Sequence, residues 1–168
     1  MPKPTAIMID LEHQKIHEGN SFVINKLFSG VADGDSVYVR FKAISQSMHI
    51  VFKVEVEGKA FLRTYEGTTY TDDGTIVTPF NRIVGDGNVV DAEIYHTPTI
   101  NTLGTQRGDR LIPAGTGGTA TGGSGGSRIE SVILPGNELL VEVQNVSTKT
   151  RDIDIVADWY QVKRWLNK

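Results

Sequence analysis

The chain has 168 residues, with 17 lysines and arginines against 20 aspartates and glutamates, and a formal charge of −3. This length is typical of one domain, and so small a charge supplies no general field for nucleic acid or anionic lipid. The absence of cysteine excludes disulfides, thiolate nucleophiles and cysteine zinc sites, and it favours assembly in a reducing cytoplasm. We therefore expect neither nucleic acid nor a membrane as a partner.

The first 20 residues are predicted to form an N-terminal arm or edge strand. Pro2 and Pro4 keep its start extended, and a strand-like stretch over 5–17 could add to the sheet of a neighbouring subunit. Asp10 and Glu12 place charges where the apolar part of a signal peptide would lie, which argues against secretion.

Two histidines stand four residues apart in this arm. His13 and His17 share one face on either a strand or a helix, and Glu12 and Glu18 beside them would suit a metal ion. However, Gln14 follows His13, so the zinc-protease pattern HExxH is absent. Two ligands do not make a metal site, and the simpler interpretation is a polar edge strand or an interface.

From residue 21 onward the hydrophobic pattern has a period of two, as in half-buried antiparallel strands. In VFKVEVEG, for example, Phe52, Val54 and Val56 fall on one face. The same alternation predicts inward positions for Val37, Val39, Phe41, Leu139, Val141, Val143, Ile153, Ile155 and Ala157. The predicted strands lie near residues 5–17, 21–28, 35–44, 47–57, 59–66, 68–79, 88–96, 107–113, 128–134, 138–147 and 151–162.

Turn signals separate these runs at intervals of about 8–12 residues, as in all-β sandwiches and barrels. The clearest hairpin is predicted in TYTDDGTIVT, because Asp73 and Gly74 accept the positive φ angles of a tight turn. About ten antiparallel strands without a repeat predict an all-β, two-sheet sandwich with jelly-roll topology. An immunoglobulin-like sandwich is the alternative. We expect one such domain over residues 21–162.

The sequence GTGGTATGGSGGS at residues 115–127 is rich in glycine. As an interdomain linker it would leave only about three strands downstream, too few to fold alone. No lysine follows the glycines, as a phosphate-binding loop requires, and the G-x-S-x-G match at Ser124 lacks the strand and helix of a nucleophile elbow. We predict a mobile loop within the single domain, with weak density in an isolated subunit.

Aromatic residues gather near the end of the chain. Trp159 or Tyr160 is expected to close the core beside the last strand. Trp165 lies in a basic tail, residues 163–168, which is either a docking element, since Trp and Arg are favoured interface anchors, or a frayed terminus.

Candidate catalytic residues are few. The pairs Asp72–Asp73 and Asp152/Asp154 could supply the two carboxylates of a glycosidase. Turn chemistry explains the first pair better, and the solvated face of a strand explains the second. A hydrolase within a jelly roll would need a deep pocket with His13, His49 or His96 beside carboxylates. Nothing marks such a constellation, so we expect no enzyme and no cofactor.

Several short motifs follow one another in an order found in a known group of proteins. They are IHEGNSF at 16–22, TYEGTTYTDDGT at 64–75, Asn81-Arg82, IYHTPTINTLGT at 94–105, RIESVILPGNELLVEVQN at 128–145 and ADWYQ at 157–161. In this order of motifs the chain resembles the capsid decoration, or cement, proteins of tailed bacteriophages. The motifs themselves mostly mark turns and strand ends.

The resemblance implies a β-sandwich or jelly-roll subunit that oligomerises, with a trimer favoured, on the outside of the icosahedral head. It would bind the major capsid protein and itself, stabilise the expanded shell of the virion, and assemble in the host cytoplasm. The family brings no catalytic residues and no cofactor. The chain departs from the family after Trp159 and Tyr160, because residues 162–168 have no counterpart there.

The residues expected to contact the capsid or another subunit are His13, Ile16, His17, Lys163, Arg164 and Trp165. The alternative function is that of a carbohydrate- or receptor-binding sandwich in a phage fibre. Sugar platforms present several exposed aromatic side chains on one sheet face, and this sequence supplies few of them.

Overall fold

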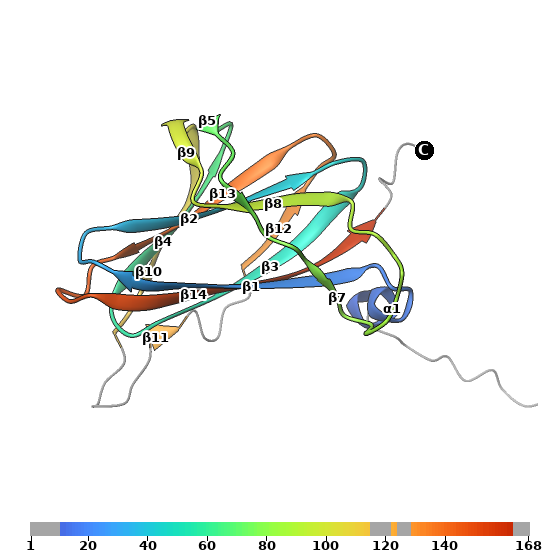
Figure 1. Ribbon diagram of the computed structural model, residues 1–168, viewed down its shortest axis with the longest axis horizontal. Helices are drawn as coiled ribbons and strands as arrows, with labels where there is room; N and C mark the ends of the chain where they lie inside the picture. The colour runs from blue at the N-terminus through green and yellow to red at the C-terminus, as the bar shows by residue number, and fades with distance from the viewer. Residues whose placement is uncertain (1–10, 115–121, 124–128, 163–168) are drawn as a thin grey trace, which may run out of the picture.

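The alternating strands form two antiparallel sheets that pack face to face (Figure 1). The computed structural model describes residues 11–114, 122–123 and 129–162. Within these residues the fold is all-β apart from one short helix. The elements are α1 (Leu11–His17), β1 (Ser21–Val31), β2 (Ser36–Ala43), β3 (Ser47–Val56), β4 (Ala60–Glu66), β5 (Thr69–Asp72), β6 (Thr75–Ile76), β7 (Phe80–Asn81), β8 (Ala92–His96), β9 (Thr99–Thr102), β10 (Thr105–Ile112), β11 (Gly122–Gly123), β12 (Ile129–Ile133), β13 (Glu138–Asn145) and β14 (Arg151–Val162).

The long strands are divided between two sheets. Sheet A has the order β11-β3-β14-β1-β7, and β12 also pairs with β3. Sheet B has the order β10-β4-β13-β2-β8-β6, while β5 and β9 form a small separate sheet. All of these pairs are antiparallel. The prediction of an antiparallel two-sheet sandwich is confirmed.

The core lies between the two sheets and consists of the side chains that the alternation predicted. Buried members include Val39, Phe41, Phe52, Val54, Val56, Leu139, Val141, Val143, Ile153, Ile155 and Ala157, while Val37 packs against them partly buried. The rings of Phe41 in sheet B and Phe52 in sheet A meet edge to face, with centroids 5.2 Å apart. The period-two pattern therefore assigned the inner face of β2, β3, β13 and β14 correctly.

The predicted strand over residues 5–17 is wrong where the structure describes it, because residues 11–17 form the helix α1. Its sequence contains helix-forming Leu, Glu, Gln and Lys, with Glu12 in the first turn and a basic last turn, as the helix dipole favours. Gly19 ends it at φ +70°. The Gly19 amide donates to Ile16 O and the Asn20 amide donates to Lys15 O, which is a Schellman termination.

The hairpin predicted in TYTDDGTIVT is also wrong. β5 pairs with β9 and β6 pairs with β8, so the two halves of this sequence belong to different sheets. The expected turn residue does reverse the chain, since Gly74 has φ +88° and its amide donates to Asp72 Oδ1 at 2.8 Å. The partners differ because the backbone of residues 96–98 lies directly against Gly74.

Substituting Gly74 tests this close approach. A Cβ there would lie 2.4 Å from His96 O and 2.8 Å from Pro98 N, both backbone atoms. We expect Gly74→Ala to lower the free energy of unfolding by at least about 2 kcal/mol, from positive-φ strain plus overpacking. Gly34→Ala is the control, because Gly34 has a similar φ of +87° but open space around it, so only about 1 kcal/mol is expected. Equal losses in urea unfolding would contradict this explanation.

Three short strands were not predicted, β7, β9 and β11, and all three pair at an edge or outside the main sheets. Within the glycine-rich run, Gly122 and Gly123 form β11 and pair with Val56 and Glu55 of β3. The rest of that run, and with it the prediction of a mobile loop, lies outside the described residues. The single helix found in the described ranges is too short and polar to span a membrane.

Candidate docking surface

The helix α1 is fixed to one end of the sandwich (Figure 1). The Asn81 side-chain amide donates to Gly19 O at 2.8 Å, and the Gln161 backbone amide donates to Asn20 O at 2.9 Å. Arg82 reaches Glu12 on the helix, with 3.8 Å between the charged atoms, and Asp158 on β14 at 3.2 Å. The first described residues and the end of β14 therefore meet at this end of the molecule.

A segment that we call the strap, residues 77–91, closes one side of the sandwich. It leaves β6 on sheet B, pairs with β1 on sheet A through β7, and returns to β8 on sheet B. Figure 1 shows it passing beside α1 on the way. Val77 and Val90, near its two ends, pack partly buried against the core. Their burial ties the strap to the sandwich at both ends.

Side-chain hydrogen bonds hold the middle of the strap. Asn81 Oδ1 accepts from the Ile83 amide at 2.8 Å, and Asp86 Oδ1 accepts from the Asn88 amide at 3.0 Å. The Asn88 side chain donates to Glu18 O at 3.2 Å, which links the strap to the end of α1. Such Asx turns let a segment with few backbone ladders keep a defined path.

Large apolar side chains on the strap point to solvent. Val84 is 99% exposed, Val89 85% and Phe80 69%. Leu11, the first residue of α1, is 47% exposed. Val77 and Val90 pack against the core, whereas Val84 and Val89 bury little of their side chains within the described part of the subunit. Exposed apolar side chains that gather in one patch are typical of a surface that meets a protein partner, and Phe80, Val84 and Val89 lie within one stretch of the strap, residues 80–89.

The structure brings three of the predicted contact residues together on α1. His13 and His17 are exposed, Ile16 is half-buried, and the two imidazole Nε2 atoms lie 3.1 Å apart. Lys163, Arg164 and Trp165 lie outside the described residues. Contact of these six residues with a capsid or another subunit stays a prediction.

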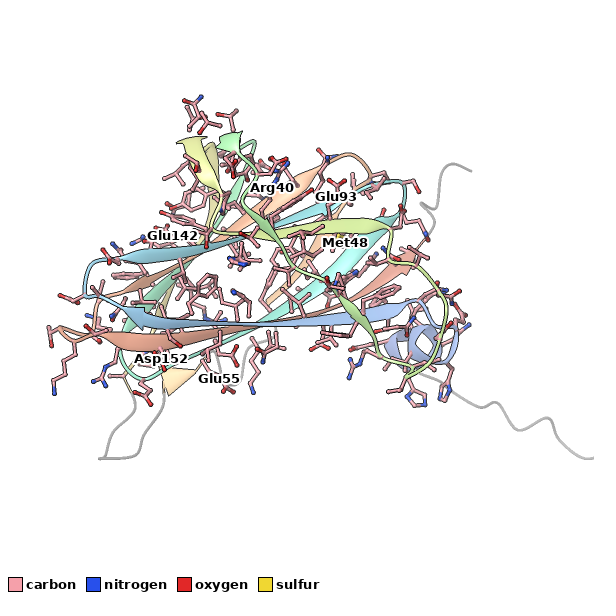
Figure 2. All side chains as sticks on the ribbon, viewed as in Figure 1. Arg40, Met48, Glu55, Glu93, Glu142 and Asp152 are labelled. Carbon is pink, nitrogen blue, oxygen red and sulfur yellow. The ribbon has the colours of Figure 1, made fainter. Side chains whose placement is uncertain are left out.

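A buried polar cluster lies on the outer face of sheet B. Glu142 on β13, labelled in Figure 2, is 5% exposed. Its carboxylate accepts from Ser36 Oγ at 2.7 Å, from Tyr65 OH at 2.7 Å and from Tyr38 OH at 3.2 Å, and it lies 3.4 Å from the Arg63 guanidinium. This cluster ties β13 to both of its neighbours, β2 and β4.

Glu142 and Tyr65 shift each other's pKa values. Burial alone would raise the pKa of Glu142, but hydrogen bonds from Ser36 and Tyr65 and the charge of Arg63 outweigh it, so the pKa lies below its usual value. Burial and the hydrogen bond to Glu142 raise the pKa of Tyr65 to about 12. The carboxylate is therefore ionised and Tyr65 neutral at neutral pH, an arrangement that holds the sheet together.

Arg40 forms a second group of polar contacts on sheet B (Figure 2). It is 7% exposed, donates to Glu138 at 2.6 Å and pairs with Asp73. Its guanidinium lies 4.3 Å from the centroid of the Tyr70 ring. Arg40 therefore connects the small β5–β9 sheet to the face of sheet B, a structural role.

The two aromatic residues at the end of β14 are buried, as expected. Trp159 is 2% exposed and stacks on Phe22, with centroids 5.9 Å apart. Tyr160 is 8% exposed and stacks on His49 at 4.8 Å. Burial lowers the pKa of His49, although Glu130 opposes that shift. Neither ring offers the exposed face that a sugar platform needs.

The side opposite the strap carries a hollow of about 820 Å³. It lies between β12 of sheet A and the ends of β4 and β10 in sheet B, and Glu66, Arg107, Val132 and Leu134 are among its lining residues. Glu66 on β4 and Arg107 on the neighbouring strand β10 pair at 2.5 Å on the sheet B side of the hollow. None of the described residues that line the hollow is a histidine.

The acidic pairs have structural partners. Asp72 caps the turn at Gly74, as turn chemistry predicts. Asp152 accepts from the Gly30 amide at 2.8 Å, and Asp154 accepts from the Asn25 side chain at 3.1 Å. Asp152 and Asp154 therefore hold β14 to β1 rather than standing only in solvent.

Sequence reasoning missed the strap and Glu142. Residues 77–91 carry neither a period of two nor a helical period, and only the pairings of β6, β7 and β8 show which side chains face outward. Glu142 stands among apolar residues in LLVEVQN, on the face opposite the predicted core positions Leu139, Val141 and Val143. Its burial depends on Tyr65 and Tyr38, which come from other strands, so no local signal marks it.

Comparison of this chain with protein-family models, with curated proteins and with solved structures found no match.

Proposed function

We propose that this chain is a structural virion protein that decorates a bacteriophage capsid from the outside, and that the strap and α1 form its docking surface. The observation that carries the proposal is the set of outward apolar side chains on the strap, Phe80, Val84 and Val89. The order of motifs that resembles phage decoration proteins supports the choice of a capsid as the partner. The major capsid protein and further copies of this chain are the proposed partners, with a trimer favoured.

The free energy gained by burying the exposed strap side chains is sufficient for docking to a capsid. Burying one exposed Val or Phe side chain at an interface is worth about 1.5–3 kcal/mol. Three of them on one held segment could supply much of the energy of a specific contact, even after the cost of association is subtracted. The anchoring of Val77 and Val90 in the core reduces that cost, because less of the strap must be ordered on binding.

The order of the strands supports the jelly-roll topology that we propose for the sandwich. Without the short strands, sheet A reads β1-β14-β3-β12 and sheet B reads β2-β13-β4-β10. The chain passes between the two sheets from β1 to β2, β2 to β3 and β3 to β4, and again from β12 to β13 and β13 to β14. Two four-stranded sheets built this way are what eight-stranded jelly rolls contain. Decoration of a shell by such a subunit needs no active site.

Charge inserted into the strap tests the proposed function. We expect Val84→Lys/Val89→Lys to weaken binding to expanded heads that lack the protein by at least about a hundredfold, because two apolar contacts are lost. Binding is measured by co-sedimentation over a range of protein concentrations.

Leu27→Lys is the matched control, since Leu27 is 53% exposed on β1 outside the strap. All variants should melt at the temperature of the wild-type chain. Heads that bind the double variant as well as the wild type would rule out the strap, and heads that ignore the wild-type chain would rule out decoration.

A further inference from the structure

His13 and His17 form a converging pair of imidazoles on the exposed side of α1. Their Nε2 atoms lie 3.1 Å apart and their ring centroids 4.6 Å apart, with the planes at 80°. The two side chains meet because residues four apart lie above one another on a helix. We propose that this pair chelates one divalent transition-metal cation of the zinc class, a property that does not depend on the proposed function.

The spacing of the two nitrogens suits a shared ion. Zinc binds histidine nitrogen at about 2.0–2.1 Å. An ion about 2.1 Å from both Nε2 atoms would see them at an angle of about 95°. Opening the pair by a few tenths of an ångström reaches the tetrahedral angle. In the absence of metal, one exposed imidazole must donate to the other in water, which is worth little.

The neighbouring carboxylates are engaged with other partners. Glu12 faces Arg82 at 3.8 Å, and Glu18 accepts from Gln14 Nε2 at 2.7 Å and pairs with Lys15. Among the described residues no group of three or more His, Asp or Glu is placed to hold a metal ion. The proposed site therefore falls short of the three or four protein ligands of a catalytic or structural zinc site. It is a weaker two-imidazole chelate, which the helical geometry adds to the four-residue spacing, with water at the remaining positions of the ion.

The ligand type sets the class of cation. Imidazole suits zinc, copper and nickel, whereas magnesium and calcium prefer oxygen ligands. A chelate across one turn also closes a ring that only the helical conformation allows, so the ion should stabilise α1. A seven-residue helix is short for independent stability, which makes this effect measurable.

Zinc titration of the full chain, purified without a histidine tag, tests the proposal by calorimetry. We expect one zinc per chain, no competition by magnesium, and affinity reduced in either His13→Gln or His17→Gln. The loss should be at least about tenfold, the effect that even second-shell changes have on metal affinity. Zinc should also slow hydrogen exchange of the Glu18 and Asn20 amides, which donate to Gln14 O and Lys15 O at 3.0 Å.

A rearranged pair provides the matched control. His17→Gln/Glu18→His keeps two histidines on the segment but sets them five residues apart, on different faces of the helix, and it should bind as weakly as the single variants. His96→Gln, on β8, should bind zinc like the wild type. Binding that survives the loss of His13 or His17, or equal binding by the rearranged pair, would refute the chelate. The same conclusion would follow if the wild-type chain binds no zinc at millimolar concentration.

Discussion

Glu142→Ala is expected to lower the free energy of unfolding by about 3 kcal/mol, the lower end of the range for breaking a buried charge pair. The lower end applies because the Arg63 side chain is 20% exposed and can regain water. Two tyrosine hydroxyls and Ser36 Oγ lose their acceptor together, and each buried donor left unpaired adds to the loss. Urea unfolding at pH 7 measures the change.

The free energy of unfolding at acidic pH distinguishes the contribution of the Glu142 charge from the contribution of its packing. The pKa of Glu142 is lower in the folded chain than its usual value, so the carboxylate stabilises the fold above the pKa of the unfolded chain, near 4.3. That contribution is lost as the pH falls through the folded pKa. Glu142→Gln should therefore be clearly less stable than the wild type at neutral pH and approach it at acidic pH.

Glu93→Gln is the matched control for both measurements. Glu93 is also on sheet B and pairs with Lys42 at 3.0 Å, but both side chains are 38% exposed. We expect a loss of no more than about 1 kcal/mol, as for other exposed ion pairs. If Glu142→Gln cost no more than Glu93→Gln at pH 7, the cluster would have no special role in joining β2, β4 and β13.

The buried face of β2, β3, β13 and β14 was predictable because an apolar pattern with a period of two indicates which side of a strand is buried. In β14 the alternation continues from Ile153 through Trp159, and every odd position over that range is buried. Such a pattern depends on nearest neighbours along the chain, so it needs no knowledge of partner strands. The register and the sheet order depend on distant residues, and those came from the structure alone.

The two failures have different physical causes. In TYTDDGTIVT the turn at Gly74 was predicted correctly, but the backbone of residues 96–98 lies against it and the strands on either side pair with distant partners. There a tertiary contact decides between local conformations that are close in free energy. At residues 11–17 the signals are local, since the Schellman termination at Gly19 ends the helix, and the contact of Glu12 with Arg82 adds to them.

The candidate site was only half accessible to sequence reasoning. The four-residue spacing places His13 and His17 on one face for either a strand or a helix, and only the helix brings both Nε2 atoms to 3.1 Å. The strap was missed because exposure of an apolar side chain cannot be inferred from its type. Val77 and Val84 are chemically identical, yet one packs against the core and the other is 99% exposed.

Trp159→Ala is expected to cost about 3–5 kcal/mol, the range for removing a large buried aromatic side chain. Trp159 is 2% exposed, stacks on Phe22 and pairs across β14 and β3 with Ile50. Phe22 in turn pairs with Asn81 of the strap. The cavity would therefore form directly under the end of the sandwich that holds α1 and the strap.

Trp159→Phe separates the loss of volume from the loss of the indole N–H. Trp159 Nε1 is buried and has no hydrogen-bond partner among the described residues, so its removal relieves an unsatisfied donor. We expect a loss of less than about 2 kcal/mol for this variant, with the stack on Phe22 retained. Both variants are compared by thermal and urea unfolding.

Hydrogen exchange then connects this core position to the docking surface. In Trp159→Ala the Arg82 and Ile83 amides, which donate to Ser21 O and Asn81 Oδ1, should exchange faster than in Trp159→Phe. The β13 amides in sheet B should change less, because β13 does not pair with β14. Equal acceleration in both places would mean that the cavity lowers global stability without loosening the strap. The strap would then owe its fixed path to its own Asx turns rather than to the core beneath it.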